Sequence, residues 1–148
     1  AKGICFALDL PLIAVNTLKL MIHPHLEKKD IDFLIPMLDA RRMEVYTAIY
    51  DKLGNCIQQT NAHVLTESSF QKIVGDSKCF IIGNGASKFQ NIKPRIRAYF
   101  SESIYHPSAK DMCSLSWEHN LNRSYEDINS FEPYYLKDFQ RTLPKKNK

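Results

Sequence analysis

The sequence lacks every pattern that directs a chain into a membrane or an oxidising compartment. No apolar run approaches the roughly 20 residues of a membrane-spanning helix, and no basic region, apolar stretch and cleavage site occur in series. The four cysteines are Cys5, Cys56, Cys79 and Cys113, and they include no Cys-x-x-Cys pair. Three of them lie inside apolar runs, where a reduced cysteine behaves as a small buried hydrophobic residue. We therefore expect a cytoplasmic protein with no membrane segment.

Patterns for metal, phosphate or nucleophile chemistry are also scarce. Among five histidines only His23 and His25 are close together, whereas a helical metal site needs i, i+4 spacing. The Gly83-Asn84-Gly85 turn lacks the Lys-Ser/Thr of a P-loop, and no G-x-S-x-G elbow occurs. We expect no metal, no cofactor, two surface histidines at a broken helix end and a tight turn at 83–85, with phosphate binding there as the alternative.

Composition and charge indicate an ordinary soluble domain. A chain of 148 residues is long enough to bury roughly 70% of its unfolded surface. Hydrophobic residues make up 44% and charged residues 24%, which is average for a soluble globular protein. The net charge is +4, and several cations fall in the last eight residues: Arg141, Lys145, Lys146 and Lys148. This tail is typical of a solvated terminus. Nucleic-acid contact is the alternative, but no basic stripe is interleaved with aromatics.

Residues 1–26 show two helix signals and one strand signal. Ile4 and Leu8 belong to an i, i+3, i+4 pattern that predicts the end of an amphipathic helix over residues 1–9. Residues 12–15 predict a short buried strand. Asn16 or Thr17 can cap a second helix, which Pro24 bends or ends and whose apolar stripe is Leu18, Met21, Ile22 and Leu26.

The segment that follows reads as an antiparallel meander. Residues 33–38 form a nearly continuous apolar run, in which Pro36 indicates an edge strand or a bulge because it cannot donate a ladder hydrogen bond. Residues 43–50 alternate between two faces, and Gly54 turns this strand into the next, near residues 56–61.

Helix and strand signals then alternate. Thr66 starts a helix that Gly75 ends, and Ser108 with Asp111 resembles a capping box for a helix carrying Met112 and Leu115. The other expected elements are strands at 79–82 and 98–100 and a helix opening at 86–89. This is the element order of a ribonuclease-H-like half-domain.

The densest charge cluster is Asp39-Ala40-Arg41-Arg42 with Glu44, between two expected strands. One interpretation is a structural corner in which Asp39 accepts hydrogen bonds from the backbone or from Arg41. The other is an arginine site for a carboxylate or phosphate on a partner. We favour the structural role and keep the partner site as the alternative.

Five blocks resemble, in order, the TsaB/YeaZ family: residues 1–18, 36–51, 82–89, 106–112 and 131–139. The DARRMEVY and EPYYLK stretches are the most specific. The resemblance implies an α/β, ribonuclease-H-like and actin-like (ASKHA) fold. It also implies a non-catalytic scaffold subunit for threonylcarbamoylation of tRNA adenosine, which pairs with the catalytic TsaD and the ATPase TsaE and meets tRNA only indirectly. A homodimer is an alternative assembly.

The family's first strands and its Gly-Pro-Gly-Ser-Phe-Thr-Gly turn have no match in this sequence. We therefore expect residues 1–30 to be the remnant of an incomplete N-terminal subdomain, 31–140 to be a complete second subdomain and 141–148 to be a basic tail. The resemblance places the TsaD contact on helices of the first subdomain, so the partner-helix remnant comprises Lys2, Ile4, Cys5 and Leu8.

Three expectations about activity follow. The fragment should bind TsaD more weakly than an intact relative and self-associate through residues 1–26. A glycoprotease-like metallopeptidase is an alternative function, and it would need a histidine pair that this sequence does not show. An actin-like nucleotide-binding protein is the other alternative, and it would need phosphate loops.

Overall fold

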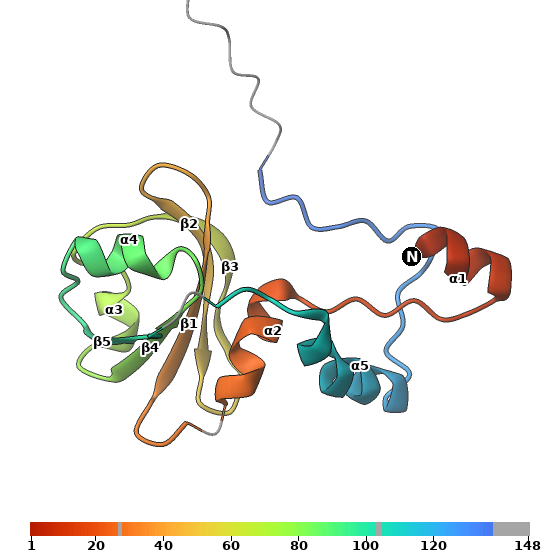
Figure 1. Cartoon of the computed structure of the whole chain (residues 1–148), viewed down its shortest axis with the longest axis horizontal. Coiled ribbons are helices and arrows are strands. Elements are labelled where there is room, and N and C mark those ends of the chain that lie inside the picture. Colours follow the sequence, from red (N-terminus) through yellow and green to blue (C-terminus); the bar gives the residue numbers. More distant parts are fainter. Residues whose placement is uncertain (27, 103–104, 138–148) are drawn as a thin grey trace, which may run out of the picture.

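The computed structural model describes residues 1–26, 28–102 and 105–137. The described residues form a five-stranded sheet in the order β3-β2-β1-β4-β5 (Figure 1). The strands are β1 Phe33–Asp39, β2 Glu44–Asp51, β3 Cys56–Val64, β4 Lys78–Ile82 and β5 Arg97–Phe100. The first three pair antiparallel, whereas β1, β4 and β5 run parallel. The predicted meander and the α/β class are confirmed.

Pro36 lies in the central strand β1, so the expectation of an edge strand is wrong. Leu34 pairs with Tyr50 of β2, and Met37 pairs with Thr47 in the same register, so there is no bulge at Pro36. The pairing with β2 is interrupted only between Leu34 and Met37. The Pro36 carbonyl accepts a hydrogen bond from the buried Thr47 hydroxyl at 2.8 Å. The missing N–H therefore affects the β2 side, while Pro36 pairs in register with Ile82 of β4 on the other side.

One face of the sheet is covered by α2, Thr17–Ile22. The Asn16 side chain accepts hydrogen bonds from the backbone N–H groups of Leu18 at 2.9 Å and Lys19 at 3.1 Å, which confirms the predicted cap. The α-helix ends at Ile22 and continues as the 3-10 turn η1, His23–His25, as Pro24 predicts. The buried cluster on this face consists of Leu18, Met21, Ile22, Ile31, Leu34, Ala48, Tyr50, Phe80 and Ile82.

The opposite face is covered by α3 (Gln71–Val74) and α4 (Ala86–Asn91) (Figure 1). Because strand side chains alternate, this face takes the odd-numbered residues of β1, β2 and β4, including Ile35, Met37, Val45, Ile49 and Ile81. The sheet is thus the middle of three layers.

One expected helix start and one expected side-chain cap are wrong. The helix expected from Thr66 begins at Gln71, because the Ser69 hydroxyl accepts from the Thr66 N–H at 2.9 Å and holds these residues in turns. Ser108 makes no side-chain cap. The Asp111 carboxylate instead accepts from the Tyr105 hydroxyl at 2.5 Å, and the 3-10 turn η2 (Ala109–Asp111) leads into α5 (Met112–Leu121).

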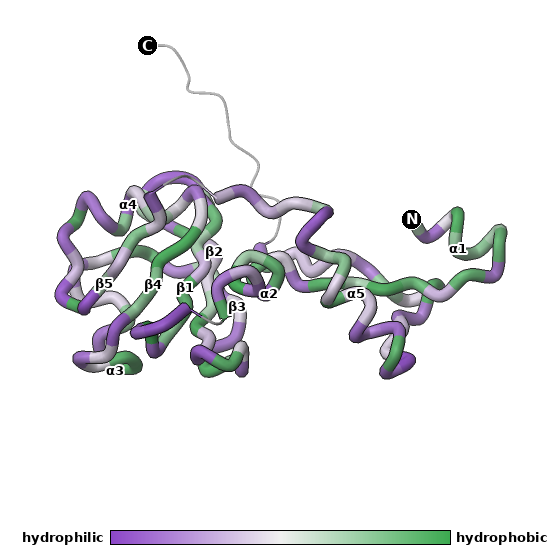
Figure 2. Tube along the Cα trace, turned by 60° about the horizontal axis from the view of Figure 1, so that its bottom comes forward, coloured by the Kyte–Doolittle hydropathy of each residue, from purple (hydrophilic) through white to green (hydrophobic). Residues whose placement is uncertain are grey.

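The expected strand at 12–15 is reduced to one isolated antiparallel bridge between Leu12 and Glu126. The expected first helix is present as α1, Lys2–Leu8. In both views, α1 lies away from the sheet, and the chain leading from it to α2 is largely hydrophobic (Figure 2).

No helix in the described ranges is long and apolar enough to cross a membrane. The basic tail predicted at 141–148 lies outside the described residues.

Candidate partner-binding surface and charged corner

The charged corner joins the end of β1 to the start of β2, as the sequence predicts. One carboxylate oxygen of Asp39 accepts hydrogen bonds from the backbone N–H of Arg41 at 2.7 Å and from the Lys88 ammonium at 2.6 Å. Arg41 and Arg42 have positive φ angles of 69° and 45°. A positive φ angle is energetically unfavourable for any residue other than glycine. The hydrogen bond from the Arg41 N–H to Asp39 helps to hold the corner in this conformation.

Two residues from the following strand–turn–helix complete the corner. Lys88 belongs to α4, and its hydrogen bond is the main reason that the pKa of Asp39 lies below its usual range; the Arg41 N–H contributes next. The Asn84 side chain accepts from the Asp39 backbone N–H at 2.9 Å. The 83–85 turn, which sequence reasoning treated separately, therefore supports the corner.

A third sequence block reaches the same place. Glu44 forms an ion pair with Lys137, from the EPYYLK stretch. The guanidinium groups of Arg41 and Arg42 are in no ion pair within the described ranges, and both residues are exposed. The structure thus assigns the hydrogen bonding of the corner to Asp39 and Glu44 and leaves the two arginine side chains directed to solvent.

The expected partner-helix residues lie on α1, in which no residue is buried. Ile4 is 64% exposed, Phe6 75% and Leu8 64%. At 100° per residue, these three side chains spread over more than one side of the helix. A helix that is apolar on several sides is normally buried, so α1 has the character of an element that needs covering.

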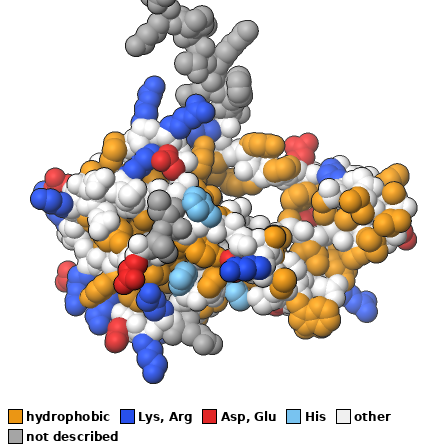
Figure 3. All heavy atoms as spheres, in the orientation of Figure 1, with side chains coloured by type: hydrophobic (Ala, Val, Ile, Leu, Met, Phe, Trp, Pro, Cys, Tyr) orange, Lys and Arg blue, Asp and Glu red, His pale blue; other side chains and the backbone are white. Residues whose placement is uncertain are grey.

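The other two expected residues connect α1 to its surroundings. The Lys2 ammonium donates to the Phe131 carbonyl at 2.9 Å, and the partly buried Cys5 accepts from the Leu10 N–H at 2.9 Å through its carbonyl. Helix α5 adds Trp117, 63% exposed, and Leu121, 65% exposed. Helices α1 and α5 form a part of the molecule that projects from the sheet, and Figure 3 shows hydrophobic side chains gathered over this projecting part.

A cleft of about 770 Å³ lies between the projecting part and the sheet. Leu18 of α2, Tyr46 of β2, Leu115 of α5 and the segment 131–137 contribute to its wall. Its lining is mainly apolar, and Tyr134 and Tyr135 beside it are exposed. The cleft continues the apolar character of the α1 and α5 surface.

His25 does not lie on the surface as expected. Its ring packs edge-on against Phe80 and Tyr105, with centroid distances of 5.2 and 5.8 Å. Burial, assisted by the nearby Lys28 charge, lowers the pKa of His25. Within the described ranges, no three His, Cys, Asp or Glu side chains are grouped so that they could hold a metal ion.

The strand order and the helices on both faces of the sheet define an α/β protein of the actin-like fold. A family model described as "TsaD: tRNA N6-adenosine threonylcarbamoyltransferase" matches residues 1–141, and the chain belongs to this family.

Two solved structures share the fold. YeaZ from Pseudomonas aeruginosa matches with a TM-score of 0.66 and 23% identity, over 90% of this chain and 64% of that one. An uncharacterized protein from Pseudomonas aeruginosa with similarity to peptidase YEAZ matches with a TM-score of 0.74 and 21% identity, over 92% of this chain and 63% of that one. The resemblance to TsaB/YeaZ is thus confirmed in the fold, and the chain spans less than two thirds of either structure. No curated protein matches the chain.

Proposed function

We propose that this chain acts as a non-catalytic scaffold in tRNA threonylcarbamoylation and binds a TsaD homologue through α1. The observation that carries the proposal is the exposure of Ile4, Phe6 and Leu8 on a helix with no buried residue. A TsaE homologue is the second expected partner, and tRNA contact is indirect. A cytoplasmic location belongs to the same proposal.

The energetics of α1 favour association. Full burial of one large apolar side chain contributes about 1.5–3 kcal/mol, and α1 and α5 together expose five such side chains at 60% or more: Ile4, Phe6, Leu8, Trp117 and Leu121. Aromatic residues such as Phe6 and Trp117 are also enriched at the centres of protein interfaces. A partner helix packed against α1 and α5 could therefore bury several large apolar side chains in one contact.

The charged corner supplies a second, polar contact in this proposal. Asp39 and Glu44 already have cationic partners in the chain, whereas the exposed guanidinium groups of Arg41 and Arg42 are available to a carboxylate on the partner. In this proposal the partner-binding role that was considered for the whole 39–44 cluster is therefore assigned to Arg41 and Arg42.

The test compares exposed apolar residues of α1 with an exposed apolar residue elsewhere on the molecule. Phe6→Ser combined with Leu8→Ser removes two exposed side chains of α1, and Leu53→Ser removes a side chain that is 74% exposed in the β2–β3 turn. Calorimetric titration of the full 148-residue chain with the TsaD homologue should show binding that the double variant weakens by at least about tenfold, with the Leu53 variant unchanged.

Two outcomes would contradict the proposal. One is equal affinity of the double variant and the unaltered chain, which would place the interface elsewhere. The other is the absence of any complex at the highest concentrations used, while sedimentation shows that α1 only joins two copies of this chain.

A further inference from the structure

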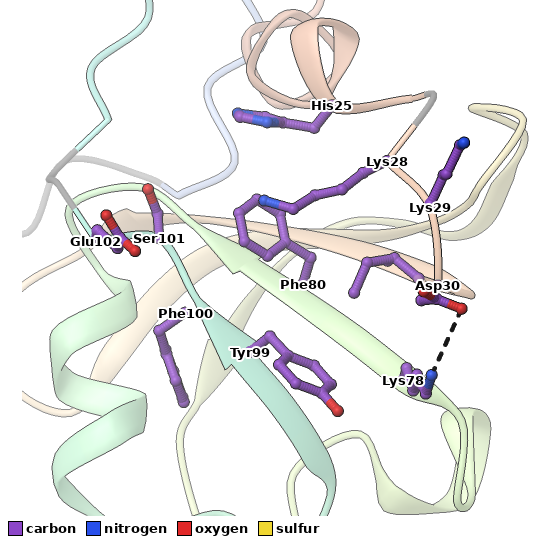
Figure 4. Close-up of a pocket in the computed structure, with 11 residues that line it drawn as sticks. His25, Lys28, Lys29, Asp30, Lys78, Phe80, Tyr99, Phe100, Ser101 and Glu102 are labelled. Atoms are coloured by element: carbon purple, nitrogen blue, oxygen red, sulfur yellow. Dashed lines mark ion pairs between the residues drawn. The ribbon is translucent and has the colours of Figure 1, made fainter.

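A second hollow, of about 760 Å³, lies on the α2 face of the sheet beside β5 (Figure 4). Three segments that are distant in sequence form its wall: residues 25 and 28–31, the start of β4, and residues 99–102. The volume is within the usual range for small-molecule sites. We refer to it as the β4–β5 hollow.

The parallel pairing of β4 and β5 places aromatic and cationic side chains side by side. Phe80 pairs with Tyr99 and Lys78 with Arg97. Phe80 belongs to the α2-face cluster, and paired residues point to the same face, so the Tyr99 ring lies beside Phe80. Tyr99 is 47% exposed, because α2 covers β1 and β4 but leaves the edge strand open.

Cations surround this aromatic floor. The Lys28 ammonium lies 3.7 Å from the centroid of the Phe80 ring, and its side chain extends over the sheet (Figure 4). Lys29 and Lys78 stand at the rim. Two acidic residues also line the hollow: Asp30, which is 3.8 Å from Lys78 with its side chain 86% exposed, and Glu102, at the opposite end in Figure 4. Three lysines and two carboxylates thus line the hollow, so its lining has an excess of positive charge.

We infer that the β4–β5 hollow binds a nucleoside phosphate, either free or as one unit of an RNA strand. The base would stack on the exposed Tyr99 ring, and the phosphate would lie among Lys28, Lys29 and Lys78. An open aromatic ring with adjacent cations is the combination that binds unpaired nucleotides without reading their sequence. Strand pairing, His25 and residues 28–31 assemble it, so no local sequence pattern shows it.

This inference goes beyond the scaffold role and does not depend on it. The hollow is built on β4 and β5, whereas the proposed partner surface is on α1 and α5. Loss of TsaD binding on mutation of α1 would leave nucleotide binding intact, and the reverse also holds. Failure of one proposal is therefore distinguishable from failure of the other.

The experiment uses the full 148-residue chain and two probes. Fluorescence anisotropy follows a labelled oligoadenylate of about 12 nucleotides. AMP is titrated directly by calorimetry and is also added as a competitor of the oligonucleotide. Tyr99→Ala should weaken binding by at least about fivefold, whereas Tyr99→Phe keeps the ring and should bind normally. Lys28→Gln with Lys78→Gln should reduce the salt dependence, by a slope of about one per lysine.

Matched controls come from outside the hollow. Tyr134→Ala removes a tyrosine that is 77% exposed, and Lys72→Gln removes an exposed lysine of α3; neither should change binding. Competition by AMP would identify a free nucleotide as a sufficient ligand, and binding of the oligonucleotide alone would identify an RNA strand. The inference is overturned if neither probe binds saturably at low salt, or if the folded Tyr99→Ala and double lysine variants bind as the unaltered chain does.

Discussion

Replacement of Asp39 by alanine tests the charged corner most directly. The change removes the acceptor of two hydrogen bonds, from the Arg41 backbone N–H at 2.7 Å and from the Lys88 ammonium at 2.6 Å. The Asp39 N–H keeps its bond to the Asn84 side chain, because that bond uses the backbone. The expected result is a weaker corner in an otherwise intact sheet.

The expected loss is the sum of two modest contributions. The hydrogen bond from the Arg41 N–H contributes about 0.5–1.5 kcal/mol to the free energy of unfolding. The Asp39 side chain is 37% exposed and Lys88 20% exposed, so screening by water limits the ion pair to about 0.2–1 kcal/mol. We expect Asp39→Ala to lower the free energy of unfolding by about 1–2 kcal/mol. Asp39→Asn should cost about half as much, because the amide oxygen can still accept from Arg41.

The pH dependence separates the charged contact from the neutral one. The pKa of Asp39 is lowered in the folded chain, mainly by Lys88. The contribution of this carboxylate to the free energy of unfolding is therefore fully present above its unfolded pKa of about 3.9, and it is lost as the pH falls through its folded pKa. The difference between the unaltered chain and Asp39→Ala should therefore shrink at low pH.

Urea denaturation followed by circular dichroism measures these differences. Asp76→Ala is the matched control, because Asp76 is exposed and forms no hydrogen bond or ion pair within the described ranges. Arg41→Ala should change stability by less than about 0.5 kcal/mol, because Arg41 contributes its backbone N–H. An Asp39→Ala midpoint equal to that of Asp76→Ala would refute the structural role of Asp39.

Two further predictions concern the turn after β4 and the partly buried histidines. Gly83→Ala should lower stability by about 2–5 kcal/mol in thermal melts, because an added Cβ would lie 2.3 Å from the Met37 carbonyl oxygen and φ is 109°; Gly75→Ala, with no atom within 4 Å, should cost less. Burial lowers the pKa of His63 and His25, so the unfolded chain takes up protons first and stability should fall as the pH drops below about 6.5. Urea midpoints that are independent of pH between about 7 and 5, or equally pH-dependent in the His63→Gln variant, would contradict this.

Elements with local signals were predictable from sequence. The Asn16 cap, the break of the helix at Pro24 and the turn at 83–85 depend on residues next to them, so their physical causes lie within a few positions. The strand expected at 12–15 is not formed, because its one backbone bridge within the described ranges is to Glu126, more than a hundred residues away. The Ser108 cap failed because Asp111 bonds to Tyr105 instead.

For the candidate sites, sequence by itself determined the chemistry at each position: a carboxylate and two arginines at 39–42, apolar residues along α1, and lysines at 28, 29 and 78. Only the tertiary structure decided their partners. Asp39 meets Lys88 across 49 positions and Glu44 meets Lys137 across 93, while Tyr99 joins Phe80 and Lys28 through strand pairing and the segment preceding β1. The physical reason is that hydrogen bonding and packing depend on distance in space, which sheet order sets and local sequence patterns do not contain.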